Sequence, residues 1–305
     1  MKKLSIVVPA YNEADCIAKF VAAVSGLGLG NPLEIVFVDD GSTDETLARI
    51  QEAAAKDERI RYVSFSRNFG KEAAMLAGLR HATGELAVTM DADLQHDPAV
   101  LKTMLAAIET EGYDCAAACR VTRTGEPGLR SWCAHRFYAL MSGFSEVALR
   151  DGSMDFRMMT RQVVDAVLSL GECGRFTKGI YEWVGFRTKW IETENVDRAA
   201  GSSKWSFRSL FLYSIRGFLA FSTAPLQMAS VLGVACCALS LLFLAGVGVR
   251  GLCTGNWGGG TALLIFLILF VGGLQLSVLG LIGLYLGGVF REVKRRPVYI
   301  VKEAK

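Results

Sequence analysis

The first two-thirds of the chain alternate short, largely apolar runs with longer mixed segments. The runs lie at 4–8, 34–38, 61–65 and 86–90, and each ends at a Pro, Ser or Asp. Apolar runs of this length are typical of strands buried on both faces. Residues such as Ser42-Thr43-Asp44 are typical helix starts and place a helix after a strand. The alternation therefore predicts an α/β domain with an open sheet.

Charged side chains stand close behind three of these runs. Asp39 and Asp40 end the second, Lys71 follows the third, and Asp91-Ala92-Asp93 ends the fourth. Open α/β sheets bind ligands at the carboxyl edge of their strands, where two carboxylates hold a hard divalent cation that in turn holds a diphosphate. The pattern favours one nucleotide-binding cleft. The alternative is a solvated acidic turn before a helix starting at Pro98. His96 is expected to be a surface histidine at that helix start, and the alternative for it is contact with a metal ion.

The composition changes after about Ser222. Segments 228–249 and 261–289 are apolar and uncharged, and a polar, Gly-rich turn at 250–260 joins them. About 20 apolar residues cross a hydrocarbon core of about 30 Å, so the two segments predict a transmembrane hairpin. Two buried helices of a soluble protein are the alternative.

Basic residues flank the hairpin on both sides: Lys204, Arg208 and Arg216 before it, and Arg291, Lys294, Arg295 and Arg296 after it. The turn holds only Arg250. Because basic residues concentrate on the cytoplasmic side, we expect both chain ends in the cytosol and the turn outside. Segment 207–224 mixes aromatic and apolar residues with arginines, which suits an interfacial amphipathic helix; a helix packed within the domain is the alternative.

Charge and cysteine usage exclude other classes. The 33 Lys+Arg and 30 Asp+Glu residues give a net charge of +3, too balanced for nucleic-acid binding over the surface. The 8 cysteines form no Cys-x-x-Cys pair, so a disulfide framework or cysteine metal site is not expected, and a reducing cytoplasm fits. The first apolar run is too short for a signal peptide.

Several motifs together resemble a known family: Pro9-Ala-Tyr-Asn-Glu13, Asp39-Asp-Gly-Ser-Thr-Asp44, Arg67-Asn-Phe-Gly-Lys71 and Asp91-Ala-Asp-Leu-Gln-His-Asp-Pro98. They are similar to motifs of the A-type inverting glycosyltransferases. The branch they resemble is that of the polyprenyl-phosphate glycosyltransferases, which includes dolichol-phosphate mannose synthases and bacterial undecaprenyl-phosphate sugar transferases. The resemblance covers residue 1 to about 205 and continues into the membrane part. It implies an A-type, Rossmann-like nucleotide-binding α/β domain, an interfacial helix and a two-helix hairpin.

The resemblance implies a donor site for a nucleotide-diphosphate sugar, formed by Pro9, Tyr11, Glu13, Asp39, Asp40, Lys71, Asp91, Ala92, Arg198 and Lys204. A metal ion, Mg²⁺ or Mn²⁺, is expected on Asp91, Asp93 and Gln95, because carboxylate and amide oxygens are hard ligands. It would neutralise the leaving diphosphate. Lys71 is alternatively a solvated lysine at a helix start, and Lys204 a membrane-surface residue.

The expected catalytic set is Asp93, Asp155, Arg120 and Arg136. The resemblance implies the place of Asp155 in it. The acceptor phosphate is expected on Arg120, Arg130, Arg136 and Ser203, since arginine forks pair with phosphate oxygens. A lipid phosphate is already ionised and needs no strong base, so Asp155 either orients the acceptor or carries a proton. A basic helix face is the alternative for Arg130 and Arg136, and stabilisation of its own loop for Arg157.

The resemblance implies inverting sugar transfer to undecaprenyl or another polyprenyl phosphate on the cytosolic membrane face, with UDP-glucose as the leading donor. The β-linked product would serve cell-envelope polysaccharide or lipopolysaccharide modification. A UDP-4-amino-arabinose derivative, a UDP-N-acetylhexosamine and GDP-mannose stay open as donors. A processive polysaccharide synthase is disfavoured because a Gln-x-x-Arg-Trp motif is absent, and a non-catalytic scaffold because the acidic and basic site residues are present.

The expected organisation is a cytosolic domain at 1–206, an interfacial helix at 207–224, a hairpin at 225–290 and a cytosolic tail at 291–305. The protein would be a multi-pass inner-membrane protein. Gly283 and Gly287 have the spacing that allows close helix approach, and 297–302 is predicted to form a strand that joins a neighbouring subunit's sheet. We expect a homo-oligomer, such as a tetramer; the alternative is that the glycines pack the hairpin within one chain and the tail is frayed.

Overall fold

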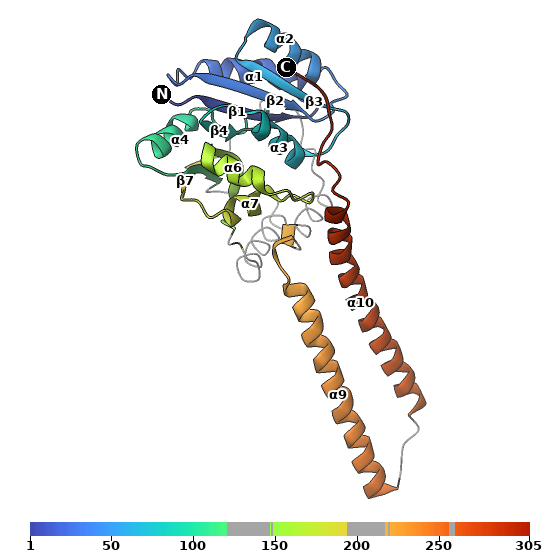
Figure 1. The fold of residues 1–305 in the computed structure, drawn as a ribbon. Coiled ribbons are helices and arrows are strands. Elements are labelled where there is room, and N and C mark those ends of the chain that lie inside the picture. The colour runs from blue at the N-terminus through green and yellow to red at the C-terminus, as the bar shows by residue number, and fades with distance from the viewer. Residues whose placement is uncertain (121–146, 148, 194–216, 219, 256–259) are drawn as a thin grey trace.

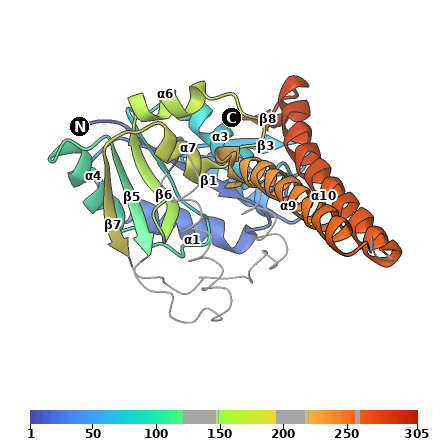
Figure 2. The ribbon, with the colours of Figure 1, turned by 90° about the horizontal axis from the view of Figure 1, so that it is seen from below.

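The computed structural model describes residues 1–120, 147, 149–193, 217–218, 220–255 and 260–305. A mixed sheet with helices on both faces forms one end of the molecule (Figure 1). Two long helices, α9 (Ala224–Thr254) and α10 (Thr261–Val293), run side by side away from it, as the view from below also shows (Figure 2). After α10 the chain returns to the sheet (Figure 1). The predicted α/β domain is confirmed.

In the described residues the strands are β1 (Leu4–Ala10), β2 (Leu33–Asp39), β3 (Ile60–Phe65), β4 (Leu86–Thr89), β5 (Cys115–Arg120), β6 (Ser153–Thr160), β7 (Thr188–Thr193) and β8 (Val301–Ala304). The helices of the domain are α1 (Ala14–Ser25), α2 (Thr46–Lys56), α3 (Lys71–His81), α4 (Val100–Glu109), α6 (Arg161–Ser169) and α7 (Thr177–Trp183). Each of the four runs predicted as strands forms one.

The strand order is β7-β5-β6-β4-β1-β2-β3-β8. β1 pairs in parallel with β2 and β4, whereas β6 and β8 run antiparallel to their neighbours. From β1 the chain passes to β2 and β3 on one side and then crosses to β4 on the other. The carboxyl ends of β1 and β4 therefore border a topological switch point, the usual ligand position in such sheets.

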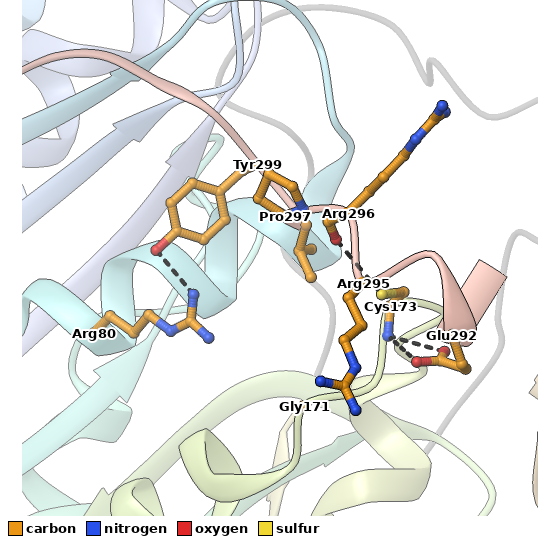
Figure 3. Close-up of a pocket in the computed structure, with 9 residues that line it drawn as sticks. Arg80, Gly171, Cys173, Glu292, Arg295, Arg296, Pro297 and Tyr299 are labelled. Atoms are coloured by element: carbon orange, nitrogen blue, oxygen red, sulfur yellow. Dashed lines mark hydrogen bonds between the residues drawn. The ribbon is translucent and has the colours of Figure 1, made fainter.

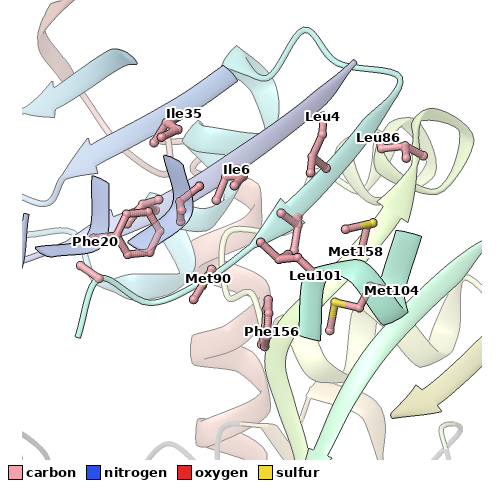
Figure 4. Close-up of a cluster of buried hydrophobic side chains, with 14 of the residues drawn as sticks. Leu4, Ile6, Phe20, Ile35, Leu86, Met90, Leu101, Met104, Phe156 and Met158 are labelled. Carbon is pink, nitrogen blue, oxygen red and sulfur yellow. The ribbon is translucent and has the colours of Figure 1, made fainter. Parts of the chain in front are cut away.

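Alternating side chains of β1 supply both faces of the core. Leu4 and Ile6 pack with α1, α2 and α4 (Figure 4), whereas Val7 packs with α3, α6 and α7. A Cβ at Gly78 would lie 2.1 Å from Cγ1 of Val7, so glycine lets α3 lie directly on β1. Burial on both faces explains why these strands are continuous apolar runs.

The long helices expose apolar side chains. Val231, Leu242 and Leu276 are 69%, 70% and 71% exposed. Among the described residues, one helical segment, Phe270–Val293, has the length and apolar composition needed to cross a membrane, and none of its most apolar window is buried. For this segment, the alternative of a buried helix in a soluble protein is therefore wrong.

Both helices run past their predicted ends. α9 continues through Arg250 to Thr254, inside the predicted turn, and ends at Gly255, whose φ of 66° makes a left-handed cap. α10 continues to Val293, since residues such as Arg291 lower hydropathy but are good helix formers. Residues 194–216 and 219 lie outside the described residues, so the helix predicted at 207–224 is seen only in its helical residues 217–218 and 220–221.

The C-terminal tail joins the chain's own sheet. β8 pairs antiparallel with β3, and Tyr299 stacks on Phe65 with ring centroids 4.9 Å apart. Gln51 donates a hydrogen bond to Glu303 at 2.8 Å. The strand lies at 301–304 instead of the predicted 297–302. The prediction that it joins a neighbouring subunit is wrong in this structure, because the chain turns back after α10 and covers the free edge of β3 itself.

A buried carboxylate connects β1, β2 and β3. Glu34 is 3% exposed and accepts hydrogen bonds from Ser5 Oγ, from the N–H and hydroxyl of Thr83, and from Arg61. Burial acts to raise the pKa of Glu34, but these donors outweigh it and lower the pKa from 4.5 to about 2. The ionised carboxylate therefore stabilises the fold above pH 4.5, and this contribution is lost as the pH falls toward 2.

Replacing Glu34 with Gln should lower the free energy of unfolding at pH 7 by about 2–3 kcal/mol, because the charged acceptor is lost. The difference from wild type should shrink as the pH falls from 4.5 toward 2, where the wild-type carboxyl also becomes neutral. Thermal unfolding of the full chain in detergent measures both effects. Glu45→Gln makes the same change on an exposed carboxylate that pairs with Arg49 on the surface, and it is the control, with little expected change. A Glu34→Gln deficit that is independent of pH would contradict the charge argument.

Candidate active site

The loops after β1 and β2 are bonded to each other at the carboxyl edge. Ser42 Oγ accepts the N–H of Asn12 at 3.0 Å, and Asn12 Oδ1 accepts the N–H of Thr43 at 2.9 Å. Asn12, and Leu94 in the loop after β4, have φ values of 52° and 55°. Left-handed backbone at non-glycine residues stores strain and concentrates at functional sites. The loops beside the switch point are thus held in specific conformations.

Lys71 lies between two carboxylates at this edge. It is the first residue of α3, and its Nζ is 2.8 Å from Asp91, after β4, and 2.8 Å from Asp155, on β6. Thr89 and Arg157 are register partners on these strands, so continuing the ladder brings Asp91 opposite Asp155. Exposures of 30% for Lys71 and Asp91 and 21% for Asp155 leave the cluster open to a ligand.

Two lysines control the charge of Asp155. Burial acts to raise the pKa of Asp155, but Lys71 and then Lys178 outweigh it, and the pKa lies well below its usual range. Lys178, on α7, donates to the carbonyl of Ser153 at 2.7 Å. The carboxylate is ionised at neutral pH and has no proton to donate. Sequence reasoning missed Lys178, because it stands in no recognisable motif.

Asp93 lies on the α1 side of the loop after β4. Its Oδ1 accepts the N–H of Gln95 at 3.2 Å. Burial, Glu13 and then Asp93 raise the pKa of Cys16 on α1 to about 11. The charge of Asp93 thus acts on the α1 side of the loop.

The carboxylates fit a metal ion only together with a substrate. Within the described ranges, no group of three or more His, Cys, Asp or Glu side chains has a metal-binding arrangement. Asp91 and Asp93 nevertheless offer hard oxygen ligands at one strand end, and Mg²⁺ is commonly bound by one or two carboxylates plus substrate phosphates. The residues therefore fit a divalent cation that binds with a diphosphate.

His96 belongs to the site, and the expectation of a surface histidine at a helix start is wrong. Its ring stacks on Phe156 of β6 with centroids 5.3 Å apart, and α4 begins only at Val100. Burial lowers the pKa of His96, while nearby charges also act on it: Asp91, Lys71, Asp93 and Asp155. The imidazole is therefore held among the charged groups, next to the candidate metal ligands.

Asp39 and Asp40 support the loops of the site. Asp39 accepts hydrogen bonds from the N–H of Ser42 and the hydroxyl of Ser64, and Asp40 accepts the N–H groups of Phe69 and Gly70. Burial raises the pKa of Asp40 to about 6 against the effect of these donors. Both carboxylates are 4% exposed or less. Their predicted contacts to a donor stay predictions.

The other predicted residues divide into two groups. Pro9, Tyr11 and Glu13 are half-buried at the end of β1, Ala92 is buried, and Arg120 is half-buried at the end of β5. The structure does not describe Arg130, Arg136, Arg198, Ser203 and Lys204.

Arg157 supports β6 from inside the domain. It is 2% exposed, pairs with Glu182 at 2.9 Å and lies 4.6 Å from the ring centroid of Tyr181. These contacts agree with the role in stabilising its own segment.

A family described as Glycosyl transferase family 2 matches residues 5–168. The chain is 42% identical over 303 residues to the putative glycosyltransferase CsbB of Bacillus subtilis (strain 168), covering 99% of this chain and 92% of the relative. It is 38% identical over 304 residues to the SfII prophage-derived bactoprenol glucosyl transferase of Shigella flexneri, covering 99% and 98%. Identity to the prophage bactoprenol glucosyl transferase homolog of Escherichia coli (strain K12) is 35% over 305 residues, covering 99% of each chain.

Similarity to solved structures is weaker. Glucosyl-3-phosphoglycerate synthase from Mycobacterium tuberculosis, in complex with Mn2+ and uridine-diphosphate-glucose, is 19% identical with a TM-score of 0.48, covering 72% of this chain and 77% of that one.

Replacing Lys71 with Met should lower the unfolding temperature, because Asp91 and Asp155 would then face each other without a cation. The free energy of unfolding should fall by about 1–3 kcal/mol, which lies between the values for fully exposed and fully buried ion pairs. Lys71→Arg keeps the charge and is the matched control. Thermal unfolding of the full chain at pH 7 compares the three proteins, and a Met variant as stable as wild type would rule out a supporting role for the ion pair.

Proposed function

Since this chain belongs to glycosyl transferase family 2, as its motifs predicted, we propose that it transfers a sugar from a nucleotide-diphosphate donor to undecaprenyl or another polyprenyl phosphate. The observation that carries the proposal is the cluster at the carboxyl edge, where Lys71 joins Asp91 and Asp155 beside Asp93. The names of the bactoprenol relatives favour glucose as the sugar and a polyprenyl acceptor. UDP-glucose is the proposed donor.

Asp91 and Asp93 act on the donor side of the cleft. With the amide oxygen of Gln95 they would hold Mg²⁺ or Mn²⁺, which neutralises charge on the leaving diphosphate when bound. Tyr11 and Glu13, at the end of β1, are proposed to meet the base and ribose. The ammonium group of Lys71, fixed 2.8 Å from Asp91 and Asp155, supplies a stationary positive charge for a phosphate.

The acceptor phosphate needs guidance more than activation, since it is ionised at neutral pH. An Asp155 with a strongly lowered pKa is a weak base. We therefore assign it a positioning role, in which it directs Lys71 and Lys178 toward the point where two anionic substrates meet. Arg120 is proposed to bind the acceptor phosphate. Five further residues lie outside the described part of the structure, and we propose for them the roles predicted from the sequence. Arg130, Arg136 and Ser203 would bind the acceptor phosphate, and Arg198 and Lys204 would bind the donor.

Direct displacement by the acceptor phosphate would invert the anomeric carbon and give a β-linked product. A UDP-4-amino-arabinose derivative, a UDP-N-acetylhexosamine and GDP-mannose are the competing donors, since pocket shape rather than these motifs selects the sugar. No observation favours a processive synthase over transfer of a single sugar.

The helical pair is proposed to cross the inner membrane. Apolar side chains exposed along α9 and α10 would then face lipid. Residues 207–216 are proposed to lie in the headgroup layer, since Phe221, near the end of the predicted interfacial helix, packs in the core of the domain. The basic residues after α10 favour a cytosolic domain and tail. Glu292, near the end of α10, accepts the N–H groups of Cys173 and Gly174, which fixes the helix to the domain. The Gly283/Gly287 pair is proposed to pack a homo-oligomer.

Replacing Asp93 with Asn should abolish sugar transfer, because one of two metal-binding carboxylates is lost. The assay uses membranes, undecaprenyl phosphate and a panel of radiolabelled UDP- and GDP-sugars, with UDP-glucose expected to give the lipid product. EDTA should stop the reaction, and Mg²⁺ or Mn²⁺ should restore it. Asp97→Asn, an exposed carboxylate that bonds only the N–H of Ala99 in the described structure, is the control. Turnover in metal-free buffer would remove the metal from the proposal.

A topology map tests the membrane placement separately. A reporter at Gly255, between the helices, should appear outside the cytosol, whereas reporters on the N-terminal domain and after Lys305 should appear inside. Basic residues concentrate on the cytosolic side of a membrane. Several follow α10, whereas Arg250 is the only one near the turn. An N-terminal domain outside would contradict the arrangement, since nucleotide sugars are cytosolic.

A further inference from the structure

A cavity of about 520 Å³ lies where α10 ends and the tail begins (Figure 3). Arg80, near the end of α3, the loop before α7 and the residues around Arg295 line it. Arg80 stands nine residues along α3 from Lys71, about 14 Å at a rise of 1.5 Å per residue. The cavity is therefore at the opposite end of α3 from the ion-paired cluster, too far to hold the reacting phosphate.

Two guanidinium groups face this cavity from different walls. The side chains of Arg80 and Arg295 extend into the same space, whereas that of Arg296 turns away (Figure 3). Arg80 donates to the hydroxyl of Tyr299 at 3.4 Å and lies over the ring, with its Cζ 5.6 Å from the centroid, which holds it against the wall. Neither Arg80 nor Arg295 takes part in the ion pairs found among the described residues.

Glu292, the acidic residue that lines the cavity, is already hydrogen-bonded to the loop before α7. The carboxylate of Glu292 accepts the N–H of Cys173 at 2.9 Å and that of Gly174 at 3.2 Å. Its charge is thus directed to the loop before α7. Of the charged side chains that face the cavity, the two arginines keep donors available for an anion.

The backbone at Arg295 is strained. Its φ is 47°, a left-handed conformation that costs a residue with a Cβ about 1–2 kcal/mol. Glycine adopts this conformation without that cost. An arginine in such a position suggests that its side chain is needed where the strained backbone puts it.

We propose that this cavity binds the phosphate group of an anionic phospholipid of the cytoplasmic leaflet, with Arg80 and Arg295 as its donors. The inference rests on the membrane placement proposed above. The apolar segment Phe270–Val293 ends two residues before Arg295, so the cavity lies at headgroup depth. Arginine forks match phosphate oxygens, and basic pockets beside membrane helices bind anionic headgroups. A lipid bound there would connect α3 to the end of α10.

Native mass spectrometry of the full-length protein in detergent, titrated with phosphatidylglycerol, tests the site. Wild type should retain phosphatidylglycerol in preference to phosphatidylcholine, and Arg295→Gln should weaken this binding about tenfold, as expected for a lost charge-assisted hydrogen bond. Arg296→Gln is the matched control, since it makes the same charge change on a side chain that turns away, and it should bind like wild type. Arg295→Gly should weaken binding equally while its unfolding temperature is retained or rises, because the strain is relieved.

Equal weakening by Arg295→Gln and Arg296→Gln would overturn the proposal, because the lipid would then respond to diffuse charge. So would equal retention of phosphatidylglycerol and phosphatidylcholine. Inorganic phosphate at low millimolar concentration should not displace the lipid; if it does, the cavity is a site for a soluble anion instead. Lipid retention is measured without donor or acceptor, so its outcome is independent of sugar transfer.

Discussion

Like charges at a half-buried sheet edge repel, and Lys71 offsets this repulsion for Asp91 and Asp155. Asp91 follows β4 and Asp155 lies on the antiparallel β6, so the sheet register brings the two carboxylates together. The lysine is placed by α3, which lies directly on β1 because Gly78 has no side chain. Helix packing, sheet register and one ion pair thus jointly define the candidate site.

The turn before Lys71 is supported from both sides. Asp40, buried at the end of β2, accepts the N–H groups of Phe69 and Gly70. Phe69 packs edge-on against Phe65, with ring centroids 5.7 Å apart, and Phe65 stacks on Tyr299 of the tail. A continuous row of side chains therefore connects the segment that follows α10 with the start of α3. The tail is part of the structural support of the site, although it is the last segment of the chain.

The long helices contact the domain near its surface. Tyr285 of α10 donates to the carbonyl of Ser222, before α9, at 2.7 Å, and Glu292 binds the loop before α7. β8 then adds to the sheet beyond β3. These connections fix the exposed apolar pair to the α/β domain through hydrogen bonds at one helix end. If the pair crosses a membrane as proposed, they set the position of the cleft relative to the lipid surface.

The amino-acid sequence by itself determined the alternating strands and helices, the carboxylates behind β2 and β4, and Lys71 at a helix start, because burial and turn chemistry act over a few neighbouring residues. Only the tertiary structure decided that Lys71 pairs with Asp155, that His96 stacks on Phe156, and that the tail returns to β3. Lys178 also belongs to the site only through tertiary packing, because α7 brings it to β6. Each of these contacts joins residues far apart in sequence, and their energies depend on register and packing between elements, which no local pattern encodes.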